Sequence, residues 1–355
     1  PWFYEIRDNG GLRGLGRQVG DYNLLYQTLI ALLTYIPVGD NNYYVMYLYK
    51  ILSCIFDFSL AFSAAFTIAR IKKEKIFSVL FCSVYTLVLF LPTVVMNSAF
   101  WAQCDAIYAT FAILCLLSLY QEKFLRAFVL FGISFAFKFQ TIFLFPFMVA
   151  CYFYKNKFSF LLFGVSAFVF WCSGIPAFLN GRPLTAPFTL YAGQTGSYED
   201  MYLSICSFWM LFANDYPRFK NLALITALIL CGIGLFAVMS GKKKLDTPVQ
   251  FYHTAAWFVW SCVFFLPAMH DRYAFLQDLL LLMLAFLDRK YVKYAVVSFV
   301  MSFMAYANYL TWLNGVEERD SLILFFVWAH FTYTIFKPEE NISPVMQSNS
   351  GKNKA

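Results

Sequence analysis

Residues 76–120 read IFSVLFCSVYTLVLFLPTVVMNSAFWAQCDAIYATFAILCLLSLY, which is two long apolar stretches joined by a short polar run. The first stretch extends from Ile76 to Met96, and the second covers Ala106 to Tyr120. Between them, residues 97–105 hold two amides, an indole and a carboxylate. Apolar runs of about twenty residues match the hydrocarbon thickness of a bilayer. A carboxylate beside them is costly and usually functional. The stretch therefore predicts a polar site built on a membrane scaffold.

The composition of the whole chain also indicates a membrane protein. Hydrophobic residues make up 61% of its 355 residues and charged residues only 13%, and the mean hydropathy is +0.61. Soluble domains carry about 25% charged residues, so an ordinary soluble domain is excluded. Aromatic residues reach 21%, which favours Phe-rich packing between helices. We attribute the net charge of +7 to cytoplasmic anchoring rather than to nucleic acid binding.

The nine cysteines are scattered and mostly lie inside the apolar runs. No CxxC pair and no metal-ligand spacing occurs, so we interpret them as small core residues. We predict neither a metal nor another cofactor.

Long apolar runs without alternation predict membrane-spanning helices rather than barrel strands. We predict an all-α polytopic membrane protein with about 11–12 transmembrane helices. The run 23–37 is short, and a crossing there would place 70–75 outside, so we interpret it as re-entrant. The remaining candidate spans are 43–69, 76–95, 105–120, 124–138, 139–154, 158–178, 220–240, 250–267, 273–287, 291–312 and 321–336.

Three regions are expected along the chain. Residues 1–22 are predicted to be part of a first extracytoplasmic loop whose preceding helix is missing. Residues 23–336 form the transmembrane domain, with a large extracytoplasmic loop at 179–219. Residues 337–355 are predicted to be a polar cytoplasmic tail.

Basic residues gather in five clusters between the predicted spans. Counting spans places all five on one face, which the positive-inside rule assigns to the cytoplasm. The opposite face receives 96–104, the turn near Lys138, the loop 179–219 and 268–272. This distribution predicts one extracytoplasmic site. The clusters are Arg70 to Lys75, Lys123 with Arg126, Lys155 with Lys157, Lys242 to Lys244, and Arg289 with Lys290.

Asp105 is the first candidate site residue. It is either a plain acid at a helix N-terminus, where the helix dipole favours it, or a site carboxylate. Gln103 and Asn97 would then be neighbouring hydrogen-bonding groups. Trp101 is either an interfacial anchor or a platform for a sugar ring.

Lys138 lies in FKFQT, residues 137–141, with no acid nearby in the sequence. It is either a lysine that snorkels to the interface or a cation facing an anionic ligand such as a phosphate. Gln140 falls on a different helical face, so the two residues serve different partners or the helix breaks there.

The connection LPAMHDRY, residues 266–273, is richer in polar groups than a short turn requires. Arg272 can hold phosphate oxygens in a bidentate manner, and His270 can donate a hydrogen bond or a proton. The alternative is a solvated turn with Asp271 and Arg272 as surface charges. The histidines within spans, His253 and His330, are interpreted as packed.

Two further segments contribute candidates. Asp21 precedes an apolar helix and is either its N-cap or an acid aimed into the same cavity as Asp105. Tyr191 and Gln194 belong to the aromatic, hydroxyl-rich loop 179–219. That loop suits a carbohydrate or polyprenyl-linked substrate but is also what an ordinary outer loop looks like.

Three of these runs together carry a resemblance to a known family. They are NSAFWAQCDAIY (97–108), FKFQTIF (137–143) and PAMHDRY (267–273), and residues 1–23 look like that family's first outer loop. The chain resembles bacterial polytopic glycosyltransferases of the GT-C superfamily and is similar to the GPI-anchor mannosyltransferase II family. The resemblance covers roughly residues 1–290.

The resemblance implies a multi-pass protein of the cell membrane, the bacterial plasma membrane being the expected location. Its implied activity is inverting transfer of a mannose-like hexose from a polyprenyl-phosphate donor to a hydroxyl of a glycan or glycolipid. The reaction would take place on the extracytoplasmic face, during cell-surface glycan assembly. A general base after the family's first span would fall upstream of Pro1, and the family leads us to expect Glu where Asp271 stands.

The same resemblance implies roles for the candidates. Asp105 and Asp21 would be the catalytic acids, and Lys138, His270 and Arg272 would contact the donor phosphate. The remaining candidates are expected to bind substrate: Asn97, Trp101, Gln103, Gln140, Tyr191 and Gln194.

Two other classes remain open. A transporter or flippase for lipid-linked sugars would use Asp105, Lys138 and Arg272 to line a translocation path. The sequence shows no inverted repeat, and its polar groups gather at one face, which argues against this class. A polysaccharide polymerase would also have a large outer loop and arginines.

Overall fold

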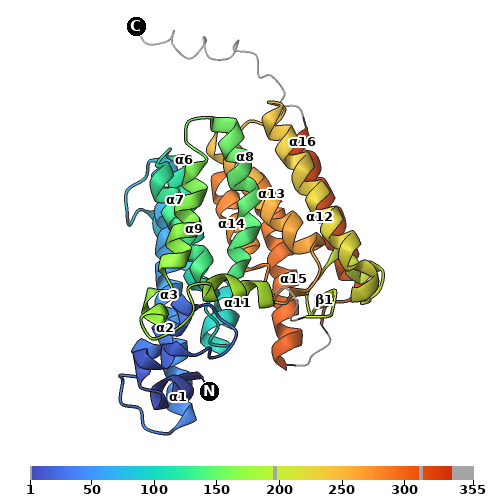
Figure 1. The fold of residues 1–355 in the computed structure, drawn as a ribbon. Coiled ribbons are helices and arrows are strands. Elements are labelled where there is room, and N and C mark those ends of the chain that lie inside the picture. Colours follow the sequence, from blue (N-terminus) through green and yellow to red (C-terminus); the bar gives the residue numbers. More distant parts are fainter. Residues whose placement is uncertain (1, 195–197, 312–314, 338–355) are drawn as a thin grey trace.

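The computed structural model describes residues 2–194, 198–311 and 315–337 (Figure 1). These residues are mostly helical, as the sequence predicts. Their only strands are β1 (Tyr202–Leu203) and β2 (Met269–His270), which pair in parallel. The predicted tail 337–355 lies outside the described residues except for Lys337.

The first part of the chain, up to residue 155, contains helices of 4 to 31 residues. In order they are α1 (Trp2–Asp8), η1 (Gly11–Gly16), α2 (Leu24–Leu33), α3 (Asn42–Lys72), α4 (Val79–Leu89), α5 (Pro92–Val95), η2 (Met96–Phe100), α6 (Asp105–Tyr120), α7 (Phe124–Phe137), η3 (Phe139–Leu144) and α8 (Phe145–Lys155).

The second part continues the bundle. Its helices are α9 (Leu161–Cys172), α10 (Ile175–Phe178), α11 (Ala186–Gln194), η4 (Phe208–Leu211), α12 (Tyr216–Met239), α13 (Pro248–Phe265), α14 (Phe275–Leu287), η5 (Arg289–Tyr291), α15 (Val292–Thr311) and α16 (Glu318–Phe336). The predicted loop 179–219 is therefore partly helical, because α11 and η4 lie within it.

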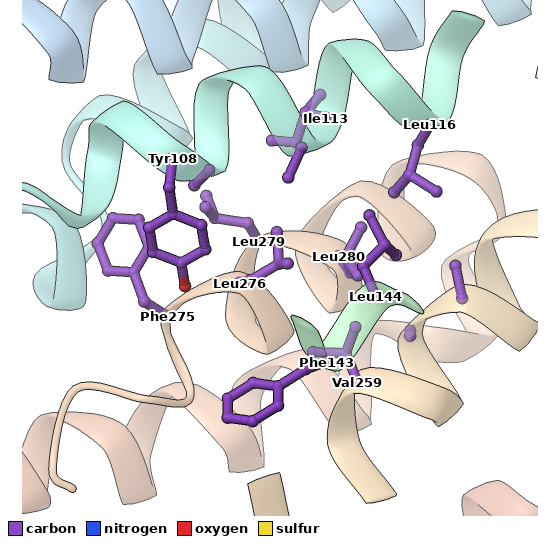
Figure 2. Close-up of a cluster of buried hydrophobic side chains, with 14 of the residues drawn as sticks. Tyr108, Ile113, Leu116, Phe143, Leu144, Val259, Phe275, Leu276, Leu279 and Leu280 are labelled. Atoms are coloured by element: carbon purple, nitrogen blue, oxygen red, sulfur yellow. The ribbon is translucent and has the colours of Figure 1, made fainter. Parts of the chain in front are cut away.

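The centre of the bundle consists of α6, α13 and α14. Every residue from Phe251 to Phe265 of α13 is buried, and so is every residue from Phe275 to Leu284 of α14. Helices that are apolar all round belong in the interior, where each face meets another helix. Figure 2 shows side chains of α6, η3, α13 and α14 meeting in this core. This core packs together the helices whose ends carry the converging polar residues.

The outer surface of the bundle is apolar as well. Leu228 and Phe236 of α12 are 71% and 64% exposed, and α3, α15 and α16 also expose large apolar side chains along their outer faces. Continuous exposed apolar surface of this kind marks contact with a membrane or another protein. This surface is consistent with a membrane protein.

Within the ranges that the structure describes, two helices, α3 and α12, are long and apolar enough to cross a membrane. Val79–Leu89 and Pro92–Phe100 would make a third span if the bent pair counts as one. Several other apolar helices have 10–17 residues. At about 1.5 Å per residue these are shorter than the roughly 30 Å hydrocarbon core. The predicted 11–12 crossings therefore remain a prediction.

The predicted span 76–95 is not a straight helix. The chain bends by 48° between α4 and the segment Pro92–Phe100. Pro92 is the first residue of α5, where it has no N–H to donate to the preceding turn. A π-helical turn, η2, then follows and carries Asn97 inward. A straight span would carry the polar run past the end of the bundle. The break instead keeps this run against the bundle.

The basic clusters lie together at one end of the molecule. Lys72 Nζ donates to the Leu287 carbonyl, which adjoins the cluster of Arg289 and Lys290. Lys155 and Lys157 both bind Glu122, beside the cluster that begins at Lys123. Tyr154 binds Asp246, next to the Lys242 to Lys244 cluster. That the clusters share one end of the molecule agrees with the span count. Lys157 and Lys155 also hold the pKa of Glu122 below its usual range.

Candidate functional site

A cavity of about 1030 Å³ lies where the polar segments converge. The segments 96–104, 137–143, 179–219 and 266–273 all contribute to its wall, together with the residues before α2. Asn97 and Asp105 lie behind the wall. The predicted site residues that line the cavity are Asp21, Trp101, Gln103, Lys138, Gln140, Tyr191, Gln194, His270 and Arg272.

Lys138 is positioned by a break between α7 and η3. Its backbone is extended, with φ −152°, and its N–H closes α7 on the carbonyl of Ser134. The side chain is 3% exposed, and its ammonium group forms an ion pair with Asp105 Oδ1. The break confirms one of the alternatives for 137–141. Because the lysine is buried and paired, the interpretation of a snorkelling interfacial residue is wrong.

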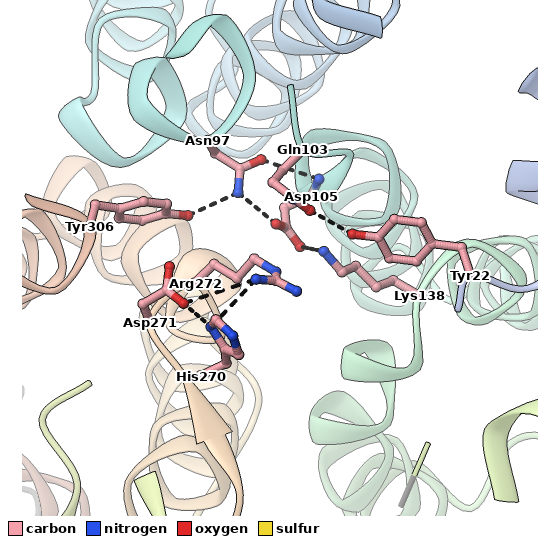
Figure 3. Close-up of polar contacts among 9 residues, drawn as sticks. All are labelled: Tyr22, Asn97, Gln103, Asp105, Lys138, His270, Asp271, Arg272 and Tyr306. Atoms are coloured by element: carbon pink, nitrogen blue, oxygen red, sulfur yellow. Dashed lines mark hydrogen bonds and ion pairs between the residues drawn. The ribbon is translucent and has the colours of Figure 1, made fainter. Parts of the chain in front are cut away.

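Asp105 is held from two sides (Figure 3). Besides the Lys138 contact on Oδ1, its Oδ2 accepts a hydrogen bond from Asn97 Nδ2 at 2.6 Å. Asn97 Nδ2 also donates to the Tyr306 hydroxyl at 2.9 Å, and Asn97 Oδ1 accepts from the Asp105 N–H at 3.3 Å. Asp105 is also the first residue of α6, where the helix dipole favours an acid. The carboxylate therefore fixes Lys138 from behind the wall, and its predicted catalytic role stays a prediction.

Arg272 forms a charged part of the wall against aromatic rings. Its Cζ lies 4.9 Å from the centre of the Trp101 ring, a cation–π arrangement. Trp101 in turn contacts Tyr309, with 4.6 Å between ring centres. Asp271 is fully buried and Arg272 is only 12% exposed, so the interpretation as a solvated turn is wrong.

His270 faces the same cavity. The pairing of β2 with β1 places it, because Leu203 stands opposite His270 in that short ladder. Burial, together with the charges of Arg272 and Lys138, lowers the pKa of the imidazole to about 3. The Asp271 carboxylate touches Nδ1 and opposes this shift, because a nearby anion favours the protonated ring.

Asp21 lines the cavity with an exposed side chain. The N-cap of α2 is Asn23, whose Oδ1 accepts from the Leu24 N–H at 2.7 Å, so the N-cap interpretation of Asp21 is wrong. Gln194 of α11 donates to the Asp21 carbonyl and ties the two segments together. Among the described residues that line the cavity, Asp21 is the only carboxylic acid.

Tyr191 and Gln103 occupy the wall in different ways. The Tyr191 hydroxyl donates to the Phe135 carbonyl at 2.6 Å, so the residue offers the cavity its ring rather than its oxygen. Gln103 accepts from the Tyr22 hydroxyl at 2.5 Å. Gln140 lines the cavity without a partner for its Oε1 among the described residues.

The sequence did not single out several residues of the site. Tyr22 lies under Lys138, with Nζ 5.4 Å from its ring centre, and Tyr306 and Tyr309 come from α15. Lys220 of α12 also lines the cavity. The three-residue spacing of Tyr306 and Tyr309, which puts them on one helical face, was the available signal. Only tertiary packing shows that this face meets Trp101.

The described part of the chain contains no group of three or more His, Cys, Asp or Glu side chains that could hold a metal ion. Cys104 lies next to Asp105, and burial raises the pKa of its thiol to about 11. A protonated, buried thiol is a poor nucleophile and a poor ligand.

Comparison with known proteins finds no matching family model and no similar curated protein. The fold and the cavity define an α-helical protein that carries a cationic, aromatic-lined site at the end opposite its basic clusters.

Proposed function

We propose that the protein is a membrane glycosyltransferase of the GT-C kind. It would move a mannose-like hexose from a polyprenyl-phosphate donor to an acceptor hydroxyl on the extracytoplasmic face. The observation that carries the proposal is the cavity wall in which Arg272 stands against Trp101, whose ring in turn contacts Tyr309. A fixed guanidinium suits a phosphate, and flat aromatic rings suit the apolar faces of a sugar.

The charges in the wall support an anionic ligand. Lys138 is neutralised by Asp105, which leaves Arg272 and Lys220 as cations along the cavity. Arg272 Nη1 lies 4.0 Å from Asp271 Oδ1, the outer limit of an ion pair, and the same carboxylate also contacts His270. Arg272 therefore keeps charge available for a ligand. Because its side chain is only 12% exposed, little water reaches the guanidinium, which strengthens that attraction.

The position of the cavity supports a lipid-linked donor. The two helices long enough to span a membrane both contribute to its wall, Met46 and Tyr49 from α3 and Leu224 from α12. Met46 is 50% exposed and Leu224 is 38% exposed, so apolar side chains continue from the cavity to the outer surface. A polyprenyl chain could leave the cavity along this surface while its phosphate stays beside Arg272.

The proposed reaction is a single displacement with inversion at the anomeric carbon. The Asp21 carboxylate takes the proton of the acceptor hydroxyl as the new C–O bond forms. The bond between the anomeric carbon and the phosphate oxygen breaks, and Arg272 stabilises the departing polyprenyl phosphate. Asp105 holds Lys138 beside that phosphate. The resemblance implies a different base, and a variant of Asp21 distinguishes the two.

The test uses the protein reconstituted in liposomes with a polyprenyl-phosphate hexose labelled in the sugar. We expect transfer to an added glycolipid acceptor. Arg272→Gln should lower kcat by about 100-fold, the usual effect of losing a group that stabilises transition-state charge. Arg272→Lys should restore part of that loss. Arg319→Gln is the matched control, because Arg319 is 71% exposed on α16 and does not line the cavity.

Two outcomes would contradict the proposal. Wild-type activity in Arg272→Gln would show that the guanidinium plays no part in the reaction. Transfer that survives in Asp21→Asn at full rate would place the base elsewhere, as the resemblance implies.

A lipid-linked-sugar flippase or transporter is the second candidate. The 48° bend before the polar run favours it, because broken helices line the substrate paths of many transporters. Movement of the labelled lipid across the liposome bilayer without sugar transfer would support this class instead.

A further inference from the structure

A second group of polar side chains lies inside the bundle, apart from the cavity. Asp278 and Gln277 belong to α14, Ser298 and Ser302 to α15, and Thr93 to α5. All are at most 5% exposed, and Asp278 is fully buried. None of them lines the cavity of the candidate site.

The oxygen atoms of this group converge on one carboxyl group. Ser298 Oγ donates to Asp278 Oδ1 at 2.6 Å, and Gln277 Nε2 donates to Ser298 Oγ at 2.9 Å. Ser302 and Thr93 also face the Asp278 carboxyl group. Within the described part of the chain, Asp278 Oδ2, Thr93 Oγ1 and Gln277 Oε1 have no hydrogen-bond partner.

Asp278 has no cationic partner among the described side chains. None of the ion pairs found among the described residues includes it. A buried carboxylate without a counter-charge is strongly unfavourable. Such a group needs either a proton or a bound cation.

The ligand set favours a hard monovalent cation. One carboxylate and otherwise neutral hydroxyl and amide oxygens supply a single negative charge, which a monovalent ion neutralises. A divalent ion would leave a buried positive charge.

We propose that Asp278, Thr93, Ser298 and Ser302 bind Na⁺ between α5, α14 and α15, with Gln277 as a further oxygen ligand. Thr93 directly follows Pro92, at the bend that separates α4 from α5. Oxygen ligands beside a broken helix are a recurring arrangement for bound Na⁺ in membrane proteins. The site stands independently of what the larger cavity binds.

Two segments connect this site to the candidate active site, and each does so over about one helical turn. Thr93 lies four residues before Asn97, and Ser302 lies four residues before Tyr306. Asn97 donates to the Tyr306 hydroxyl at 2.9 Å. A cation that holds α5 against α15 therefore also holds the groups that fix Asp105.

Thermal unfolding of the purified protein in detergent tests the proposal. NaCl is titrated against choline chloride at constant ionic strength and pH 7.5. We expect a saturable rise in Tm of about 2–4 °C with Na⁺ and none with choline, because a ligand that binds only the folded state stabilises it. Asp278→Asn should abolish the rise. Asp57→Asn is the matched control, because Asp57 is also buried but accepts from Ser98 of η2 instead.

If Asp278→Asn does not fold, Thr93→Val and Ser302→Ala keep the carboxylate and test the same site. Each should raise the Na⁺ concentration needed for half of the Tm shift several-fold. Equal Tm values in NaCl and choline chloride would overturn the proposal. A Tm that depends on pH alone would do so too, because the carboxyl group would then be protonated. A full Na⁺ response in Asp278→Asn would place the ion elsewhere.

Discussion

At the scale of single residues, we expect substitutions in the buried ion pair of Asp105 and Lys138 to have the largest effect on stability. Both side chains are at most 3% exposed, and Asn97 binds the second carboxylate oxygen. Removing either charge leaves the other buried without its partner. The pair thus links the structure of the wall to the chemistry of the site, and its loss affects folding as well as turnover.

We expect Asp105→Asn and Lys138→Met each to lower the free energy of unfolding by about 3–5 kcal/mol. The double variant should recover much of that loss, because no unpaired charge remains. Unfolding in detergent, followed for all four proteins as a double-mutant cycle, measures the coupling. Simple additivity of the two losses would show that the residues do not stabilise each other.

Among the helices, the contact between α7 and α9 depends on a glycine. A Cβ atom at Gly132 would lie 2.6 Å from the Ser166 carbonyl and 2.9 Å from Val169 Cβ. Contacts this short mean that the helices must move apart. Since α7 ends at Lys138, this packing also places the ion pair with Asp105.

Gly132→Ala should therefore destabilise the protein by about 1–3 kcal/mol, as overpacking does. Gly164→Ala on α9 is the control, because a Cβ atom at Gly164 would meet no atom of the described residues within 4 Å. That variant should be neutral or gain up to about 1 kcal/mol from helix propensity. Thermal unfolding of both variants makes the comparison, and equal stability would show that the α7–α9 contact tolerates a methyl group.

For the whole molecule, the two ends of the bundle differ in character. The basic clusters meet at one end, and the aromatic cavity occupies the other. The helix α12 connects them over 24 residues, or about 36 Å at 1.5 Å per residue. This length exceeds the roughly 30 Å of a bilayer core, so the two ends should face opposite aqueous compartments.

Single cysteines at the two ends of α12 test this orientation in a cysteine-free protein. Ala213→Cys lies exposed before α12, at the cavity end, and Ser240→Cys lies exposed directly after it. A membrane-impermeant thiol reagent added to intact cells should label Ala213→Cys only. Ser240→Cys should react after the membrane is permeabilised. The reverse pattern would place the cavity in the cytoplasm, and labelling of both in intact cells would exclude α12 as a span.

Part of the site could be predicted from local sequence. The polar runs at 97–105, 137–141 and 268–272 interrupt apolar stretches, and an interruption is visible without a structure. The run 137–141 also allowed a helix break, which the extended backbone of Lys138 confirms. By contrast, the bend at Pro92 lies inside a continuous apolar stretch, so hydropathy predicts a span over 76–95 but not the bend within it.

The sequence by itself determined the helical class, the apolar exterior and the grouping of the basic clusters, because each depends on composition and on residue order along the chain. Tertiary structure alone decided which groups meet. Asp105 and Lys138 are 33 residues apart, and Tyr306 reaches Asn97 across 209 residues. No periodicity encodes such contacts, because they depend on how the bundle folds back on itself. The packed bundle therefore decides that Asp105 stands behind the wall while Asp21 and Arg272 face the cavity.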